Sequence, residues 1–124
     1  MKKSKKILLI EDDKDLVEIY TNKFKMAGFK IDAALSVEEA IKEIEKEKYD
    51  LILLDIRLPE EDGTVFLEKA KGIIEIKSTP IIAFSNYDTP DIREKAKELG
   101  ANKYIIKSNH TPNEVIKLIE SYLK

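Results

Sequence analysis

The sequence has 124 residues and no cysteine, with 22 Lys and Arg against 24 Asp and Glu, for a net charge of −2. This length predicts a single domain, residues 1–124 with a core from about residue 5, that needs no disulfides. The missing cysteines exclude thiolate metal sites, and the balanced charge argues against direct nucleic-acid binding. Apolar runs are too short for a membrane span or a signal peptide, so we predict a cytoplasmic protein without a membrane partner.

The first predicted unit is a buried strand followed by an amphipathic helix. Residues 6–10 predict the strand, in which Ile7–Ile10 are apolar, and two acidic residues, Glu11 and Asp12, come directly after it. Asp13 is a typical helix N-cap, and the apolar spacing that follows predicts a helix to about Ala27.

The second unit has a purely structural pattern. Residues 29–33 alternate between polar and apolar side chains, which predicts a strand nearer the edge of a sheet. Ser36 and Glu39 have the spacing of a capping box, so a second helix is predicted to begin there.

The third unit places a carboxylate after a fully apolar strand. Leu51–Leu54 predict a strand buried on both faces, and Asp55 follows them. Pro59 and Gly63 then predict a loop. Thr64 is the predicted cap of a third helix, which carries Val65, Phe66, Leu67, Ala70, Ile73 and Ile74.

The last two units end their strands in a hydroxyl and in a cation. Residues 79–84 predict a strand that runs into Ser85, and residues 102–106 predict one that runs into Lys107. The helix predicted between them, residues 89–100, has a thin apolar face, which makes it a candidate moving part. A final helix is predicted to begin at a second capping box, formed by Thr111 and Glu114 with Pro112 between them.

Strict alternation of strands and helices predicts an α/β fold with a parallel sheet covered on both faces. The predicted architecture is a three-layer doubly wound (βα)5 fold with strand order 2-1-3-4-5, in which the ends of strands 1 and 3 are neighbours. Glu11, Asp12 and Asp55 would then share one pocket. Three carboxylates repel each other, and Mg²⁺, which prefers oxygen ligands, is the cation that best fits them.

Ser85 and Lys107 are predicted at the same rim of the sheet. Carboxylates, a metal ion, a hydroxyl and an ammonium group together suit a phosphoryl group. Asp55 could attack phosphorus as a nucleophile and form an acyl phosphate. Lys107 and the metal would neutralise oxygen charge, and Ser85 would donate a hydrogen bond.

Four segments carry a family resemblance: Ile7-Leu8-Leu9-Ile10-Glu11-Asp12, Leu53-Leu54-Asp55-Ile56-Arg57-Leu58-Pro59 through Asp62-Gly63, Pro80-Ile81-Ile82-Ala83-Phe84-Ser85, and Gly100-Ala101-Asn102-Lys103-Tyr104-Ile105-Ile106-Lys107. With these motifs, the chain resembles the receiver domain of two-component response regulators over about residues 5–124. The resemblance implies a phosphorylation-operated switch in a phosphorelay rather than an enzyme, with at most slow self-dephosphorylation.

The resemblance also implies a role for each matching residue. Asp55 would accept a phosphoryl group from a sensor histidine kinase or a phosphotransfer protein. Mg²⁺, for which Mn²⁺ can substitute, would be held by Glu11, Asp12, Asp55 and the backbone carbonyl of Arg57.

The implied switch uses three further residues. Ser85 would move toward the phosphate, Lys107 would pair with it, and Tyr104 would turn inward. These movements would repack the surface of the fourth helix, fifth strand and fifth helix. That surface would contact a downstream protein target or a second copy of the chain in a homodimer.

Two positions depart from the usual receiver pattern. Ser108 stands where receivers have a proline joined by a cis bond, and a cis bond before a residue other than proline costs roughly 2.5–4 kcal/mol. We therefore predict a trans Lys107–Ser108 bond and a rearranged loop. Asn86 stands where receivers usually have a small residue after the hydroxyl position. It could narrow the opening through which the phosphoryl group reaches Asp55 and so slow phosphoryl transfer. Arg57 and Tyr87 could shield the acyl phosphate from water. For Asn86, Arg57 and Tyr87 alike, ordinary surface variation is the alternative explanation.

Two other functions compete with the switch. Asp62-Gly63-Thr64 faintly resembles the signature of haloacid-dehalogenase phosphatases, but Glu60 stands where that signature needs a second Asp. A degenerate receiver that only docks onto a partner is the other alternative. The presence of all five acidic, hydroxyl and ammonium residues argues against it.

Overall fold

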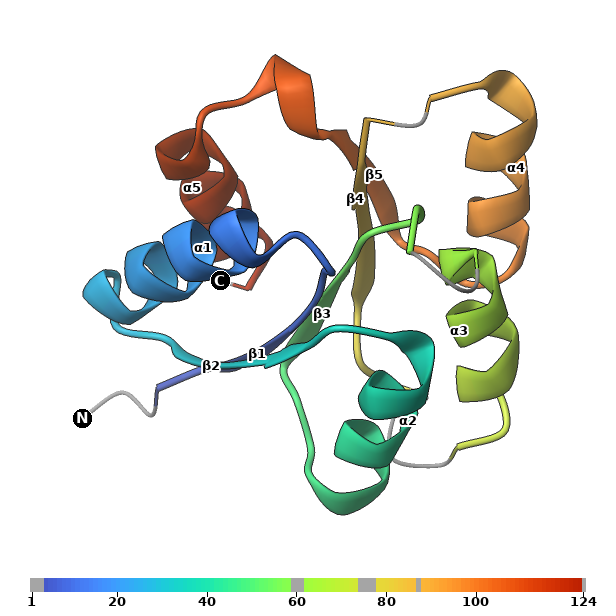
Figure 1. The fold of residues 1–124 in the computed structure, drawn as a ribbon, viewed down its shortest axis with the longest axis horizontal. Coiled ribbons are helices and arrows are strands. Elements are labelled where there is room, and N and C mark those ends of the chain that lie inside the picture. The colour runs from blue at the N-terminus through green and yellow to red at the C-terminus, as the bar shows by residue number, and fades with distance from the viewer. Residues whose placement is uncertain (1–3, 59–61, 74–77, 87, 124) are drawn as a thin grey trace.

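A five-stranded parallel sheet forms the centre of the protein (Figure 1). The computed structural model describes residues 4–58, 62–73, 78–86 and 88–123. The strands are β1 (Lys6–Ile10), β2 (Lys30–Ala34), β3 (Leu51–Leu54), β4 (Ile81–Ser85) and β5 (Lys103–Ile106). Their order, β2-β1-β3-β4-β5, confirms the predicted doubly wound α/β fold.

Helices cover both faces of the sheet. They are α1 (Lys14–Met26), α2 (Val37–Lys46), α3 (Gly63–Ala70), α4 (Pro90–Glu98) and α5 (Pro112–Tyr122), with a short 3₁₀ turn, η2 (Lys107–Asn109), after β5. Figure 1 shows α1 and α5 on one face and α2, α3 and α4 on the other. Among the described residues, no helix is both long and apolar enough to cross a bilayer.

The sheet separates two hydrophobic cores because side chains alternate along each strand. In β1, Ile7 and Leu9 pack with the α1 and α5 side, whereas Leu8 and Ile10 pack with the α2, α3 and α4 side. Both pairs are fully buried. A central strand that is buried on both faces must be apolar throughout, which explains the unbroken runs in β1 and β3.

The helix starts follow the predicted caps with two exceptions. Asp13 and Thr111 each accept backbone N–H bonds at the start of their helix, as predicted, and Thr89 does the same at the start of α4. The prediction for Thr64 was wrong: Asp62 caps α3, and its Oδ1 accepts the Thr64 N–H at 2.8 Å. At α2 the Ser36 cap is present, but Glu39 accepts from the N–H of Leu35 and not of Ser36.

The third helix is shorter than predicted. It ends at Ala70. Ile73 lies beyond it, although its side chain still packs on the core. Ile74 lies outside the described residues.

A polar cluster links β1, β2 and α2 near the amino ends of β1 and β3. The Tyr49 hydroxyl donates to Asp32 Oδ2 at 2.8 Å and lies 3.3 Å from carboxylate oxygens of Glu43 and Glu47. The Lys6 ammonium pairs with Glu47 and lies 3.6 Å from Asp32 Oδ2. The tyrosine hydroxyl and the ammonium group thus lie among three neighbouring carboxylates, which favours a structural role for the cluster.

Replacing Tyr49 by Phe is expected to lower the free energy of unfolding by about 1–2 kcal/mol, because the carboxylates lose their shared donor. Urea unfolding measures this change. Tyr122→Phe is the matched control, because the Tyr122 side chain is 37% exposed and should tolerate the same change. Equal effects of the two substitutions would contradict a structural role for the Tyr49 hydroxyl.

Candidate functional site

The register of the sheet brings four functional side chains to one rim. In the β1–β3 pair, Ile10 is opposite Leu54, and the Asp55 N–H donates to the Ile10 carbonyl at 2.9 Å. Glu11 and Asp55 therefore leave their strands side by side. Ser85 ends β4 and Lys107 follows β5 at the same rim.

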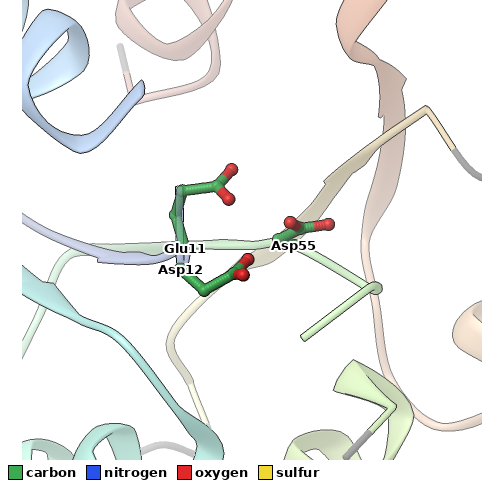
Figure 2. Close-up of side chains that lie close together, drawn as sticks. All are labelled: Glu11, Asp12 and Asp55. Carbon is green, nitrogen blue, oxygen red and sulfur yellow. The ribbon is translucent and has the colours of Figure 1, made fainter. Parts of the chain in front are cut away.

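Three carboxylates converge there, as Figure 2 shows. Glu11, Asp12 and Asp55 each offer an oxygen atom, and these atoms lie within 4.8 Å of one another. Glu11 is 1% and Asp55 is 4% exposed, whereas Asp12 is exposed. A set of hard oxygen donors that is buried on one side and open on the other fits a partly hydrated Mg²⁺ ion.

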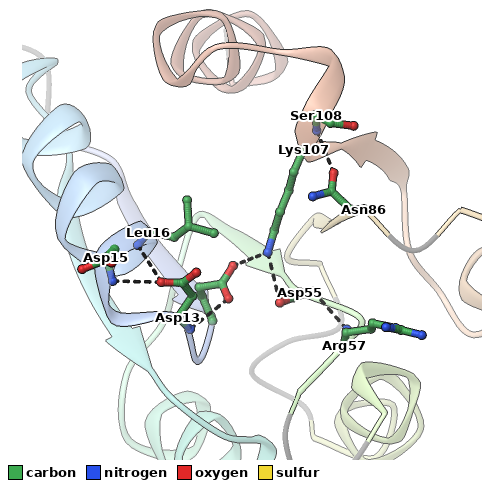
Figure 3. A network of polar contacts seen from close by, with 9 residues as sticks. Asp13, Asp15, Leu16, Asp55, Arg57, Asn86, Lys107 and Ser108 are labelled. Carbon is green, nitrogen blue, oxygen red and sulfur yellow. Dashed lines mark hydrogen bonds and ion pairs between the residues drawn. The ribbon is translucent and has the colours of Figure 1, made fainter.

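The Lys107 ammonium bridges the two buried carboxylates (Figure 3). Its Nζ lies 2.5 Å from Glu11 Oε1 and 3.1 Å from Asp55 Oδ2. Nζ also lies 5.3 Å from the centre of the Phe84 ring, a favourable cation–π position. The positive charge of the ammonium group offsets the negative charges of the two buried carboxylates. The sequence did not predict that Lys107 pairs with both.

Asp55 faces a cavity, and both of its carboxylate oxygens accept hydrogen bonds. Its Oδ1 accepts the N–H of Arg57 at 3.0 Å, and Oδ2 accepts from Lys107. The cavity has a volume of about 310 Å³ and is lined by Asp55, Arg57, Ser85, Asn86 and Lys107. The structure thus brings together the predicted nucleophile, hydroxyl and ammonium, and it places Arg57 at the same opening.

Burial dominates the electrostatics of Glu11. Desolvation, with a smaller contribution from the Asp55 charge, raises the pKa of Glu11 to about 7, although the Lys107 ammonium opposes this shift. The pKa of Lys107 is also raised: burial lowers it, but the hydrogen bond to Glu11 and the charge of Asp55 outweigh that effect.

The raised pKa of Glu11 predicts a pH-dependent stability in the presence of a chelator. The folded pKa of about 7 exceeds the ordinary value of 4.5. The folded state therefore binds more protons than the unfolded state. The stabilisation that comes from Glu11 is fully present below pH 4.5 and is lost as the pH rises to about 7. We expect a loss of up to about 3 kcal/mol between about pH 5 and pH 8. Urea unfolding of the protein and of Glu11→Gln checks this, and an equal slope in both would contradict it.

Tyr104 connects this rim to α4. It is half-buried and shares a side-chain hydrogen bond with Ser85, and burial raises its pKa. The Arg93 guanidinium lies 5.2 Å from the centre of the Tyr104 ring and is itself paired with Asp88. The family resemblance implied that Tyr104 and Ser85 act together in the switch, but the sequence had no signal for the contact with Arg93.

The peptide bond after Lys107 has the predicted trans form. The described residues contain no cis peptide bond, so Lys107–Ser108 is trans. The chain then forms the 3₁₀ turn η2. Tyr87, which was predicted near the same opening, and Pro59, which was predicted in the loop after β3, lie outside the described residues.

Gly63 is a site residue whose role the sequence did not reveal. A Cβ atom there would lie 2.5 Å from the Asp55 carbonyl oxygen and 2.8 Å from Ile56 Cα. The Gly63 N–H donates to the Ile56 carbonyl at 2.6 Å. Glycine therefore allows the start of α3 to pack directly on the backbone of Asp55. An Asp-Gly pair after a strand was the available signal, but it indicated only a loop.

A sequence profile of the response regulator receiver domain matches residues 7–120. The chain belongs to this family. Receiver domains are switch domains of phosphorylation-based two-component signalling and are not classical enzymes.

Individual relatives agree with this assignment. The transcriptional regulatory protein PhoP of Bacillus subtilis is 33% identical over 122 residues, which are 98% of this chain and 49% of the relative. HprR of Escherichia coli is 37% identical over 102 residues, or 82% of this chain and 44% of HprR. The chain thus spans about half the length of these curated relatives.

Solved receiver structures share the fold. The CheY-like receiver domain protein from Methanospirillum hungatei matches with a TM-score of 0.89 and 27% identity, covering 98% of this chain and 94% of its own. A two-component response regulator from Clostridium difficile matches with a TM-score of 0.85 and 29% identity, covering 97% and 95%.

Proposed function

We propose that this chain acts as a single receiver domain in which Asp55 accepts a phosphoryl group. The donor is a phosphohistidine on a sensor histidine kinase or phosphotransfer protein. The observation that supports this most directly is the Asp55 carboxylate, which faces a cavity and lies 3.1 Å from the Lys107 ammonium. In a member of the receiver family, this arrangement fits an acceptor with a counter-charge already in place.

In the proposed step, a carboxylate oxygen of Asp55 attacks phosphorus, and the bond from phosphorus to the histidine nitrogen breaks. The electron pair of that bond stays on the nitrogen, and Asp55 becomes an acyl phosphate. Lys107 stabilises the negative charge on the phosphoryl oxygens, and Ser85 donates a hydrogen bond to one of them. Mg²⁺ would be held by Glu11, Asp12, Asp55 and the Arg57 carbonyl, and it would supply positive charge to offset that of the transferred group.

Ser85 also provides the proposed route to a partner. If Ser85 moves toward the phosphoryl group, its hydrogen bond to Tyr104 must change. Tyr104 packs against Arg93 of α4, so this change reaches the surface of α4, β5 and α5. We propose that this surface then controls a downstream protein or a second copy of the chain.

The test is incubation with Mg²⁺ and acetyl phosphate, followed by intact-mass measurement. We expect a labile phosphoryl adduct that requires the metal ion and is lost in alkali, as an acyl phosphate is. Sustained turnover of a phosphate ester would instead favour a phosphatase. The absence of any adduct with acetyl phosphate or a phosphorylated kinase would favour a docking module.

A further inference from the structure

The two loops that flank the Asp55 cavity are joined by one hydrogen bond. The side-chain Oδ1 of Asn86 accepts the backbone N–H of Ser108 at 2.7 Å (Figure 3). Asn86 directly follows Ser85, and Ser108 directly follows Lys107. The bond therefore connects the residues next to the two side chains that would contact a phosphoryl group.

This bond supplies a cap that the turn after β5 lacks. Ser108 lies in the first part of η2, where backbone N–H groups have no partner within the turn. Ile106, which directly precedes η2, provides no side-chain cap. Asn86 supplies the missing acceptor from the neighbouring strand end. It can do so because residue 108 is a serine, which has an N–H, and because the Lys107–Ser108 bond is trans.

We propose that Asn86 is a positioning residue for Lys107, and this inference rests on the proposed function. By capping η2, Asn86 fixes the backbone from which the Lys107 side chain extends to Glu11 and Asp55. We call the hydrogen bond between Asn86 and Ser108 the clasp; it holds the Lys107 ammonium group beside the acceptor carboxylate of Asp55. The clasp also ties the Ser85 loop to the same turn.

Removal of the clasp should slow phosphoryl transfer without disturbing the fold. In Asn86→Ala, the rate of adduct formation from acetyl phosphate should fall about two- to fivefold, the factor expected for one exposed hydrogen bond. The Ser108 amide should lose protection from hydrogen exchange, measured by NMR. Asn86→Asp keeps an acceptor oxygen and should restore the protection of this amide.

A second readout separates positioning from general damage. Mg²⁺ affinity of Asn86→Ala should not weaken, because a less fixed ammonium competes less with the metal ion for Glu11 and Asp55. Asn109→Ala, an asparagine truncation in the same turn, is the matched control and should keep the wild-type rate.

Three results would overturn the inference. An unchanged rate in Asn86→Ala would remove the positioning role, and a faster rate would mean that Asn86 narrows the entrance instead. Parallel losses of rate and Mg²⁺ affinity would indicate general disruption of the site. Failure of the proposed function looks different, because the wild-type protein itself would then form no adduct.

Discussion

Asp55→Asn is expected to reduce the phosphoryl adduct to background while the protein stays folded. The neutral amide of Asn is a poor nucleophile and cannot form the acyl phosphate. Its oxygen can still accept the Arg57 N–H, which Asp55 Oδ1 accepts at 3.0 Å. Removing one buried carboxylate also relieves the charge repulsion that adds to burial in raising the pKa of Glu11. We therefore expect the free energy of unfolding to change by less than about 1 kcal/mol.

The matched control lies at the opposite end of the same strand. Asp50 precedes β3, and its Oδ2 accepts the Lys6 N–H at 2.7 Å, a bond that an asparagine oxygen can also accept. Asp50→Asn should form the adduct at the wild-type rate. Intact-mass measurement after incubation with Mg²⁺ and acetyl phosphate compares the two variants. A full adduct on Asp55→Asn would show that another residue is the acceptor.

Gly63→Ala is expected to lower both stability and the rate of phosphoryl transfer. The added methyl group would lie 2.5 Å from the Asp55 carbonyl oxygen, and a backbone atom cannot rotate away as a side chain can. Alanine favours helices over glycine by about 1 kcal/mol, but overpacking of this kind costs about 1–3 kcal/mol, and a contact this short is at the upper end. We expect a net loss of about 1–2 kcal/mol, with α3 displaced from Asp55.

Gly72→Ala tests whether the position or only the residue type matters. Its Cβ would approach no atom closer than 4.0 Å, and no positive φ is required there. The substitution should therefore be neutral or stabilise the protein by up to about 1 kcal/mol. Urea unfolding and the rate of adduct formation are measured on both variants. Wild-type values for Gly63→Ala would show that the start of α3 can move freely relative to Asp55.

The central positions of β1 and β3 followed from the sequence, and the strand order 2-1-3-4-5 was predicted because it is a common order in doubly wound sheets. Two fully apolar runs, Ile7–Ile10 and Leu51–Leu54, must be buried on both faces, and only the centre of a parallel sheet offers that. Once these strands are central neighbours, the positions of Glu11 and Asp55 follow from the chain itself. Helix ends were less certain: Asp62, not Thr64, caps α3, because either side chain can accept the same kind of backbone bond.

Contacts between side chains on distant segments were not predictable in the same way. The bond from Ser108 to Asn86 joins positions 22 residues apart, and the pair of Lys107 with Glu11 joins positions 96 apart. Hydrophobic periodicity places backbones, but it does not say which rotamer a polar side chain adopts. The clash that Gly63 avoids likewise depends on a few tenths of an ångström in how α3 packs.

The sequence by itself determined the parallel sheet and the set of acidic, hydroxyl and ammonium groups at the ends of its strands. It also reduced the strand order to a few arrangements, because burial on both faces and right-handed crossovers exclude the others. The tertiary structure alone decided how these groups pair. Lys107 lies between Glu11 and Asp55, Tyr104 contacts Ser85 and Arg93, and Asn86 caps the turn after β5. Such pairings depend on distances between side chains that only the packed fold brings together.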